Sequence, residues 1–240
     1  MKSTLNPASP PSKLWRYRYW SLAVLIATLI GCVLWERAFP TQSLRYRLTV
    51  EVETPEGIKT GSSVIEVRYS QGMALGDVSG LQSRIWGEAV YVDLGAGRNL
   101  VVTLTRSESG RKTARSPSEL PLILFKLDTN PLGSWGNPPA QGSRDVAPEM
   151  LPTLVTFRDP ADPISVKLVE PDQLESAFGP EVRIANATIE ITKDNAEATI
   201  ERHLPWLSDH PEPSLDQGGD PYDASLAKLI HFGDFIRRKT

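Results

Sequence analysis

The most regular pattern in the chain is a strict alternation of apolar and polar residues at positions 44–53, LRYRLTVEVE. Alternation with period two over ten residues is typical of a strand with one buried face. Thr54-Pro55-Glu56-Gly57 follows, with proline and glycine where a type I turn prefers them, and then SSVIEVRY at 62–69 resumes as a second strand. This part of the chain therefore predicts a β-hairpin.

Short apolar runs between Pro- and Gly-rich segments dominate the rest of the chain. The strands that they predict cover residues 87–94, 99–105, 120–127, 153–157, 164–169, 187–192 and 198–204. Eight Pro and Gly residues at 128–152 predict a long loop or a linker between two domains. A short helix is predicted at 171–178, with Gly179 as its stop. Apolar residues at helical spacing then predict an amphipathic helix at 221–238.

A different pattern lies near the amino terminus, where residues 20–35 carry no charge and are bounded by Arg18 and by Glu36-Arg37. Sixteen helical residues cover about 24 Å, against about 30 Å for a hydrocarbon core, and Tyr19 with a snorkelling Arg18 extends the run. Aromatic residues flank it on both sides, as they do at membrane interfaces. We predict a transmembrane anchor at residues 19–36, with a buried core helix as the alternative.

The basic residues around this run predict its orientation. Residues 1–18 carry four Lys and Arg, which predicts a cytoplasmic tail and places residues 37–240 outside the cytoplasmic membrane. The protein would then be a single-pass protein of a bacterial inner membrane. The segment ERAFPTQS after the run has no small-x-small cleavage site, so we expect the anchor to be retained.

Cys32 leaves a second processing route open, because Leu29-Ile30-Gly31-Cys32 resembles a bacterial lipoprotein signal in which the cysteine is lipidated. The residues that follow, Val33-Leu34-Trp35, are apolar where that signal usually turns polar, which favours the uncleaved helix. Cys32 is also the only cysteine in the chain. The exported part therefore cannot form an internal disulfide, and its stability must come from its apolar core.

Composition and charge narrow the classes of partner. The 240 residues are 40% hydrophobic and 23% charged, as in an ordinary folded chain. The net charge of −3 combines two unlike parts: residues 1–37 carry five Lys and Arg against Glu36 alone, which gives +4 and leaves −7 for residues 38–240. An acidic exported part argues against a nucleic-acid partner, which requires clustered Lys and Arg.

Several matches to catalytic patterns lack the structural context that their chemistry needs. Gly95-Ala96-Gly97 precedes a strand rather than a helix, so it predicts a hairpin turn instead of a dinucleotide site. Ser225-Leu226-Ala227-Lys228 and Lys59-Thr60-Gly61 match two penicillin-binding signatures in reversed order. His203 and His210 lie near several acids, without the spacing of a calcium loop or a zinc protease. We therefore assign no catalytic residue, metal ligand or cofactor.

Two features remain as candidates for partner contact. Arg106, Arg111, Lys112 and Arg115 form the densest basic segment beyond the amino terminus, which favours a solvated loop, with contact to an anionic surface as the alternative. Trp206 stands in an apolar tetrad, LPWL at 204–207, before a polar loop. Core packing is the preferred interpretation of Trp206, and exposure would make it an interface anchor.

Together these patterns predict a mainly β protein with some α+β structure. Its parts are a basic tail at 1–18, an anchor at 19–36, an antiparallel sandwich-like region at 41–127, a loop or linker at 128–152 and a smaller α+β part at 153–240. The hypothesis for function is a non-enzymatic, membrane-anchored extracytoplasmic module that binds an envelope protein or supports envelope assembly. A membrane-anchored carboxylate-dependent hydrolase or carbohydrate-active enzyme is the alternative, because paired carboxylates leave little signature in a sequence.

Overall fold

The computed structural model describes residues 20–31, 41–71, 81–106, 111–127, 141–196, 199–208, 214–216 and 225–239. The chain divides into two compact units, Met1–Thr41 and Gln42–Thr240. Residues 20–31 of the first unit form a helix. Within the described ranges, no helix is both long and apolar enough to cross a bilayer. The other end of the predicted anchor, including Cys32, lies outside those ranges.

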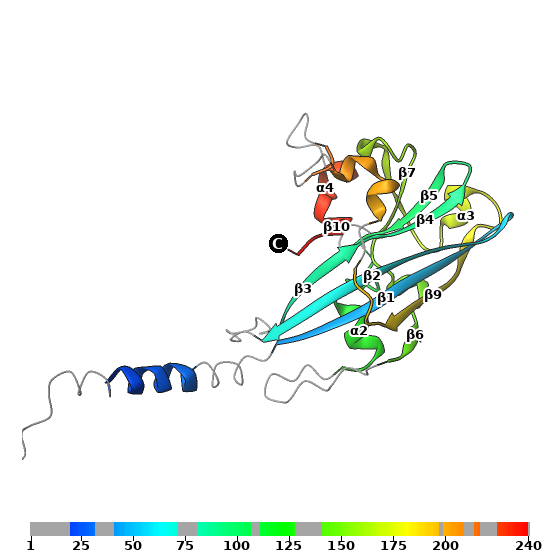
Figure 1. Cartoon of the computed structure of the whole chain (residues 1–240). Helices are drawn as coiled ribbons and strands as arrows, with labels where there is room; N and C mark the ends of the chain where they lie inside the picture. Colours follow the sequence, from blue (N-terminus) through cyan, green and yellow to red (C-terminus); the bar gives the residue numbers. More distant parts are fainter. Residues whose placement is uncertain are drawn as a thin grey trace, which may run out of the picture. The chain divides into compact units, whose positions relative to one another are not determined.

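The second unit contains a long antiparallel sheet in which the predicted hairpin is confirmed (Figure 1). Gly57, at the start of the returning strand, has a φ of 111°, which glycine adopts without strain. The strand order is β10-β3-β2-β1-β9-β6. The strands are β1 (Thr41–Thr54), β2 (Gly57–Gln71), β3 (Leu81–Glu88), β6 (Ser143–Asp145), β9 (Arg183–Ile191) and β10 (Ile236–Arg237).

A smaller antiparallel sheet has the order β4-β5-β7-β8. Its strands are β4 (Val90–Gly95), β5 (Arg98–Val102), β7 (Leu154–Phe157) and β8 (Val166–Val169), close to four of the predicted ones. Neighbouring residues of one strand enter different cores: Leu100 and Val102 pack into the first, and Val101 into the second. This sheet is therefore covered on both faces, which explains its nearly continuous apolar sequences.

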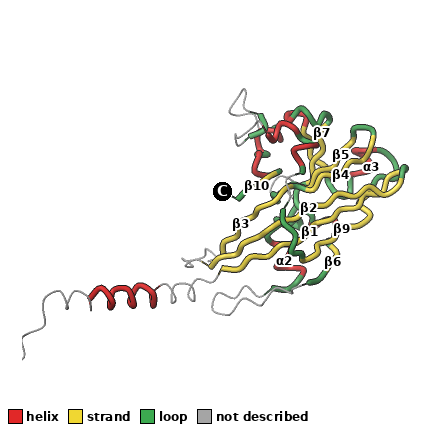
Figure 2. The backbone as a smooth tube through the Cα atoms, viewed as in Figure 1, coloured by secondary structure: helices red, strands yellow, loops and turns green. Residues whose placement is uncertain are grey.

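The two cores define three layers. The first core joins the inner face of the six-stranded sheet to the four-stranded sheet. The second covers the other face of the four-stranded sheet with short carboxyl-terminal segments (Figure 2). Phe157, Trp206 and Phe235 form its aromatic centre, with ring centroids 5.4 to 5.7 Å apart. The short segments include η4 (Ile200–Arg202), η5 (Pro205–Ser208), α4 (Leu226–Leu229) and η6 (Phe232–Asp234).

Three predicted elements were wrong. Residues 120–127 do not form a strand but overlap helix α2 (Glu119–Leu124), in which proline stands in the first turn, where its missing N–H is tolerated. Of the strand predicted at 198–204, residue 198 lies outside the described ranges, and the rest contains η4 followed by a turn at 203–204. Of the helix predicted at 221–238, residues 221–224 lie outside the described ranges. The described residues are helical only in α4 and the short η6, because Ile230 and His231 have extended backbones and the chain then pairs with β3 through β10.

Of the loop or linker predicted at 128–152, residues 128–140 lie outside the described ranges. Residues 141–152 contribute β6 and η2 (Pro148–Met150) to the body formed by Gln42–Thr240, and β6 pairs with β9. Leu151 is fully buried in the first core. The predicted short helix is present as α3 (Leu174–Phe178), ends at Gly179 with a φ of 109°, and follows η3 (Pro163–Ser165). The sheet that holds β9 also holds the predicted hairpin, so the two β-rich parts share one body.

Candidate functional site

Two adjoining hollows flank Trp86 on the outer face of the six-stranded sheet. Their volumes are about 270 Å³ and about 470 Å³. Cations from β1, β2, β3 and the carboxyl-terminal segment line them. We call these cations and the indole between them the basic–tryptophan surface; its residues are Arg45, Arg68, Arg84, Trp86, Arg237, Arg238 and Lys239.

The alternation of the strands places these side chains on the outer face. Ile65, Val67 and Ile85 point into the first core, so their neighbours in β2 and β3 point away from it. The register sets Glu66 opposite Trp86 and Arg68 opposite Arg84. Pairing of Ile236 and Arg237 with Glu88 and Gly87 then brings the last basic residues of the chain to the same face.

Trp86 lies between two cations of this surface. The Cζ atom of Arg68 is 5.2 Å from the centre of the indole ring, and Nζ of Lys239 is 5.5 Å from it. Both distances lie within the range of cation–π attraction. The half-buried indole therefore holds two long side chains beside the hollows and limits their movement.

Glu66 is the carboxylate at the base of the smaller hollow. It is 6% exposed, and its Oε2 accepts hydrogen bonds from Nε of Arg45 and from Nζ of Lys239, both at 2.7 Å. Burial raises the pKa of Glu66, but the hydrogen bonds from Lys239 and Arg45 outweigh burial and hold that pKa below its ordinary value. Glu66 is therefore ionised at neutral pH and unsuited to the role of general acid.

Glu88 is the second carboxylate on this face and is also fully engaged. Its Oε2 accepts the backbone N–H groups of Thr199 and Ile200 at 2.6 and 2.9 Å, and its Oε1 accepts the hydroxyl of Thr199 at 2.6 Å. With 4% exposure, Glu88 ties the start of η4 to the end of β3. Its role in this structure is to position the chain rather than to face a ligand.

A third hollow borders the first across Asn195 and has a balanced charge. Arg47 and Lys193 line it together with Asp194 and Glu88, and Nη2 of Arg47 lies 2.7 Å from Oδ2 of Asp194. Because its cation and anion neutralise each other, this hollow is a weaker candidate for a charged ligand than the basic–tryptophan surface.

The sequence-predicted contact residues lie elsewhere. Trp206 is 5% exposed, and its indole N–H donates to the carbonyl of Pro160 at 3.1 Å, so the condition for an interface anchor is not met and Trp206 packs in the second core. In the basic segment at 106–115, Arg106 pairs with Glu119 at 3.2 Å and Arg111 with Glu170 at 2.6 Å. Two of its cations are therefore already paired with carboxylates of the chain.

Several residues that match catalytic patterns have structural roles in this fold. Gly95, Ala96 and Gly97 all have positive φ and form the predicted hairpin turn between β4 and β5. The ring of His203 stacks on Tyr91 with centroids 4.2 Å apart. His210 lies outside the described ranges. In the described part of the chain, no group of three or more His, Cys, Asp or Glu is arranged to hold a metal ion.

The hydrolase alternative requires a carboxyl group with a raised pKa, and Glu170 comes nearest to this requirement. Burial raises its pKa, the nearby Arg111 lowers it, and Asp172 raises it, with a net increase. A hollow of about 250 Å³ opens beside this pair, but Arg111, Glu149 and Asp172 line it and Glu170 does not. Glu170 forms a partly buried ion pair with Arg111. This pair explains the presence of a partly buried carboxylate without a role in substrate binding.

Comparison of the chain with protein-family models, curated proteins and solved structures finds no match. No relative therefore supplies a function for this surface. Sequence reasoning missed that surface because its members are far apart in the chain and meet only through the register of β1, β2, β3 and β10. The one local signal is Trp86 next to Arg84 in a segment too polar to be predicted as a strand.

Proposed function

We propose that this chain is a single-pass protein of the bacterial inner membrane, with an extracytoplasmic β domain that acts as a non-enzymatic binding module for an anionic partner. The observation that carries the proposal is the basic–tryptophan surface, which gathers six cations beside two carboxylates, Glu66 and Glu88, in a part of the chain whose net charge is −7. Such a local reversal of sign steers an anionic partner to one face.

The anchoring part of the proposal rests on the uncharged run at 20–35 and its aromatic and basic flanks. The helix at residues 20–31 is consistent with it. The β domain begins at Thr41, so a helix that ends near residue 36 leaves a tether of only a few residues. A short tether would hold the first strand close to the bilayer.

Binding is favoured over catalysis by the state of the acidic groups. A carboxylate-dependent hydrolase needs one protonated and one ionised carboxyl group beside the substrate. At the basic–tryptophan surface, the pKa of Glu66 is lowered, and Glu88 accepts three hydrogen bonds from the chain. Neither group is disposed to donate a proton to a bound molecule.

The anchor and its orientation can be tested on the full chain in cells. We expect the protein to stay in the membrane pellet after alkaline carbonate extraction, and its domain to be digested by protease added to spheroplasts. A Cys32→Ser variant should migrate like the wild type, because the helix is not cleaved. Release by carbonate, protection from protease, or a slower-migrating Cys32→Ser precursor would each contradict the anchor as proposed.

A further inference from the structure

We propose that the larger hollow of the basic–tryptophan surface binds the phosphate groups of anionic lipids in the bilayer that carries the anchor. The inference rests on the proposed function, because the anchor is what brings this surface to the lipid. It adds the chemical class of the partner and the residues that recognise it.

The lining of this hollow matches a phosphate group. Four cations contribute to it, Ser83 adds a hydroxyl, and its lining contains no carboxylate; the cations are Arg68, Arg84, Arg237 and Lys239. Arginine presents a planar fork of N–H donors that fits phosphate oxygens, and lysine adds a compact charge. Arg237 is partly engaged, since its Nε donates to the carbonyl of Gly233 at 2.6 Å and its Nη2 lies 3.7 Å from Oδ1 of Asp234, and Lys239 is bound to Glu66. Arg68 and Arg84 are the cations best placed for a ligand.

The pairing of Arg68 with Arg84 is unfavourable for the fold itself. The two residues lie directly opposite each other on neighbouring strands, and both are exposed. Like charges in this position destabilise a sheet. Among the described residues, neither forms an ion pair with a carboxylate; Arg68 donates to the hydroxyl of Ser43 at 3.4 Å and lies over Trp86. An external anion between the two guanidinium groups would relieve the repulsion.

The position of the hollow favours a membrane as the source of that anion. Arg68 reaches Ser43, the third residue of β1. If the anchor ends at residue 36, only residues 37–40 precede β1, and four extended residues span at most about 14 Å. A tether of this length allows the basic groups to come within a Debye length, about 8 Å, of an anionic surface, where each gains about 1 kcal/mol.

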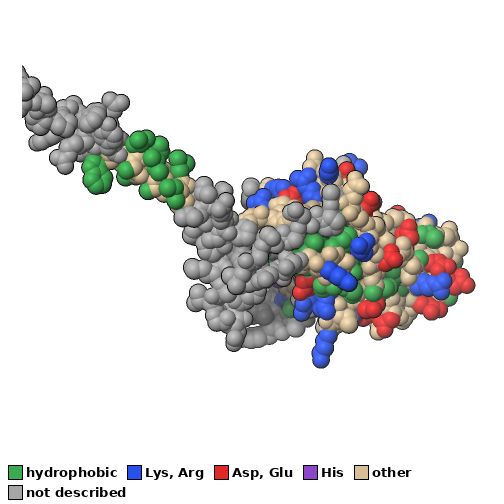
Figure 3. All heavy atoms as spheres, turned by 90° about the horizontal axis from the view of Figure 1, so that it is seen from below, with side chains coloured by type: hydrophobic (Ala, Val, Ile, Leu, Met, Phe, Trp, Pro, Cys, Tyr) green, Lys and Arg blue, Asp and Glu red, His purple; other side chains and the backbone are tan. Residues whose placement is uncertain are grey.

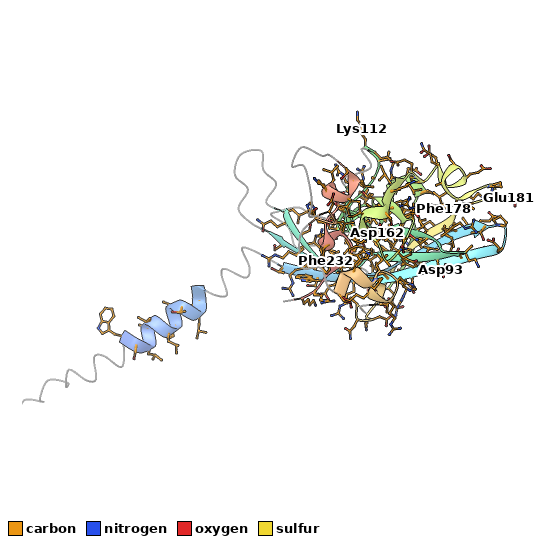
Figure 4. All side chains as sticks on the ribbon, turned by 90° about the horizontal axis from the view of Figure 1, so that it is seen from above. Asp93, Lys112, Asp162, Phe178, Glu181 and Phe232 are labelled. Atoms are coloured by element: carbon orange, nitrogen blue, oxygen red, sulfur yellow. The ribbon has the colours of Figure 1, made fainter. Side chains whose placement is uncertain are left out.

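On one face of the domain (Figure 3), acidic groups lie toward the opposite end, near the tip of the β1–β2 hairpin, where Arg98 and Arg183 are paired with Glu56 and Glu53. On the face shown in Figure 3, most Asp and Glu side chains lie toward that tip and most Lys and Arg lie away from it. Figure 4 places Asp93 and Glu181 at the tip end and Phe232, just before β10, at the other. This separation would turn the basic end of the domain toward an anionic bilayer and the acidic end away from it.

Vesicle binding by residues 41–240 tests the inference, since these residues contain the compact unit with both cores and lack the anchor. We expect them to co-sediment with vesicles of equal phosphatidylcholine and phosphatidylglycerol, and not with phosphatidylcholine alone. Arg84→Gln should weaken this binding about fivefold. Lys167→Gln, which removes an exposed cation from β8 in the other sheet, should leave it within twofold. Arg84→Lys should keep most of the binding, because the charge is retained.

The stability of the same variants separates binding from folding. Removal of the like-charge pair should raise the Tm of Arg84→Gln by about 1–3 °C, so weaker vesicle binding would not result from a damaged fold. Equal losses in Arg84→Gln and Lys167→Gln, or equal binding to both kinds of vesicle, would overturn the inference.

Inorganic phosphate distinguishes the lipid from a soluble source of the same group. We expect only weak binding of inorganic phosphate in titration calorimetry, because one phosphate lacks the multiple contacts of a charged bilayer. Tight binding of inorganic phosphate without vesicle binding would overturn the lipid assignment in favour of a soluble phosphate-bearing ligand. Because the fragment has no anchor, failure here is separate from failure of the extraction and protease experiments on the full chain.

Discussion

A Gly61→Ala substitution should destabilise the β domain by about 3 kcal/mol or prevent its folding. A Cβ atom at this position would lie 2.3 Å from the carbonyl oxygen of Tyr91 and 2.9 Å from Cγ2 of Val92. The first neighbour is backbone, so relief requires β2 to move away from β4, and overpacking of this kind costs about 1–3 kcal/mol or more. Urea unfolding of residues 41–240, followed by circular dichroism, measures the change.

Gly233→Ala is the matched control for this prediction. A Cβ atom at Gly233 meets no atom within 4 Å, and its φ lies outside the left-handed region. We expect the free energy of unfolding of this variant to stay within about 0.5 kcal/mol of the wild type. Equal stabilities for the two alanine variants would show that β2 and β4 do not approach as closely as described.

Replacement of Glu88 by alanine should lower the free energy of unfolding by about 3 kcal/mol. The variant removes the acceptor of the Thr199 and Ile200 N–H groups and of the Thr199 hydroxyl. Hydrogen bonds to a charged group contribute about 1.5–3 kcal/mol each, and buried donors left without a partner add a further penalty. Thermal and urea unfolding of residues 41–240 check the value.

The Glu88→Gln variant keeps the size and hydrogen-bonding geometry of this side chain and removes its charge. The amide oxygen can still accept the two N–H groups and the amide nitrogen can face the threonine hydroxyl, so we expect a smaller loss than in Glu88→Ala. Glu190→Ala, at an exposed position of β9, should change stability by less than about 0.5 kcal/mol. A Glu88→Ala variant as stable as Glu190→Ala would mean that η4 does not depend on this carboxylate.

The elements that sequence patterns predicted well are those in which burial follows directly from the residues. The alternating residues at 44–53 form most of β1, and the inward-facing residues of this strand are fully or almost fully buried. The apolar runs of β4, β5, β7 and β8 reflect a sheet buried on both faces. Here local sequence and tertiary packing point to the same structure, which is why short runs were sufficient.

The elements that were missed depend on partners far away in the chain. β3 has one buried apolar residue in the first core, Ile85, with the partly buried Leu81 packed against that core, and it owes its strand conformation to pairing with β2. The carboxyl-terminal residues have helical spacing, yet the free edge of β3 takes Ile236 and Arg237 as a strand. The basic–tryptophan surface joins these missed elements to β1 and β2, so it was not visible before the register was known.

The basic–tryptophan surface also shows that the net charge of the exported part does not describe each of its faces. A net charge of −7 beyond the anchor argued against anionic partners of the nucleic-acid type, and it concealed a local group of six cations on one face. The basic segment at 106–115 was the more obvious candidate from sequence, but two of its arginines are paired with Glu119 and Glu170. On the basic–tryptophan surface, Arg45 and Lys239 are likewise paired with Glu66, Arg237 with Asp234 and Arg238 with Glu201. Arg68 and Arg84, which form no ion pair among the described residues, are therefore the cations that this surface offers to a partner.

Site-specific photo-crosslinking in native membranes tests the central claim most directly. A photoreactive residue in place of Arg84 in the full chain, compared with one in place of Lys167, reports what lies against each position. We predict a phospholipid adduct at position 84 and little or none at 167. A defined protein adduct at 84 alone would keep the binding module and contradict the lipid assignment, and equal or absent crosslinking at both positions would contradict the role of this surface altogether.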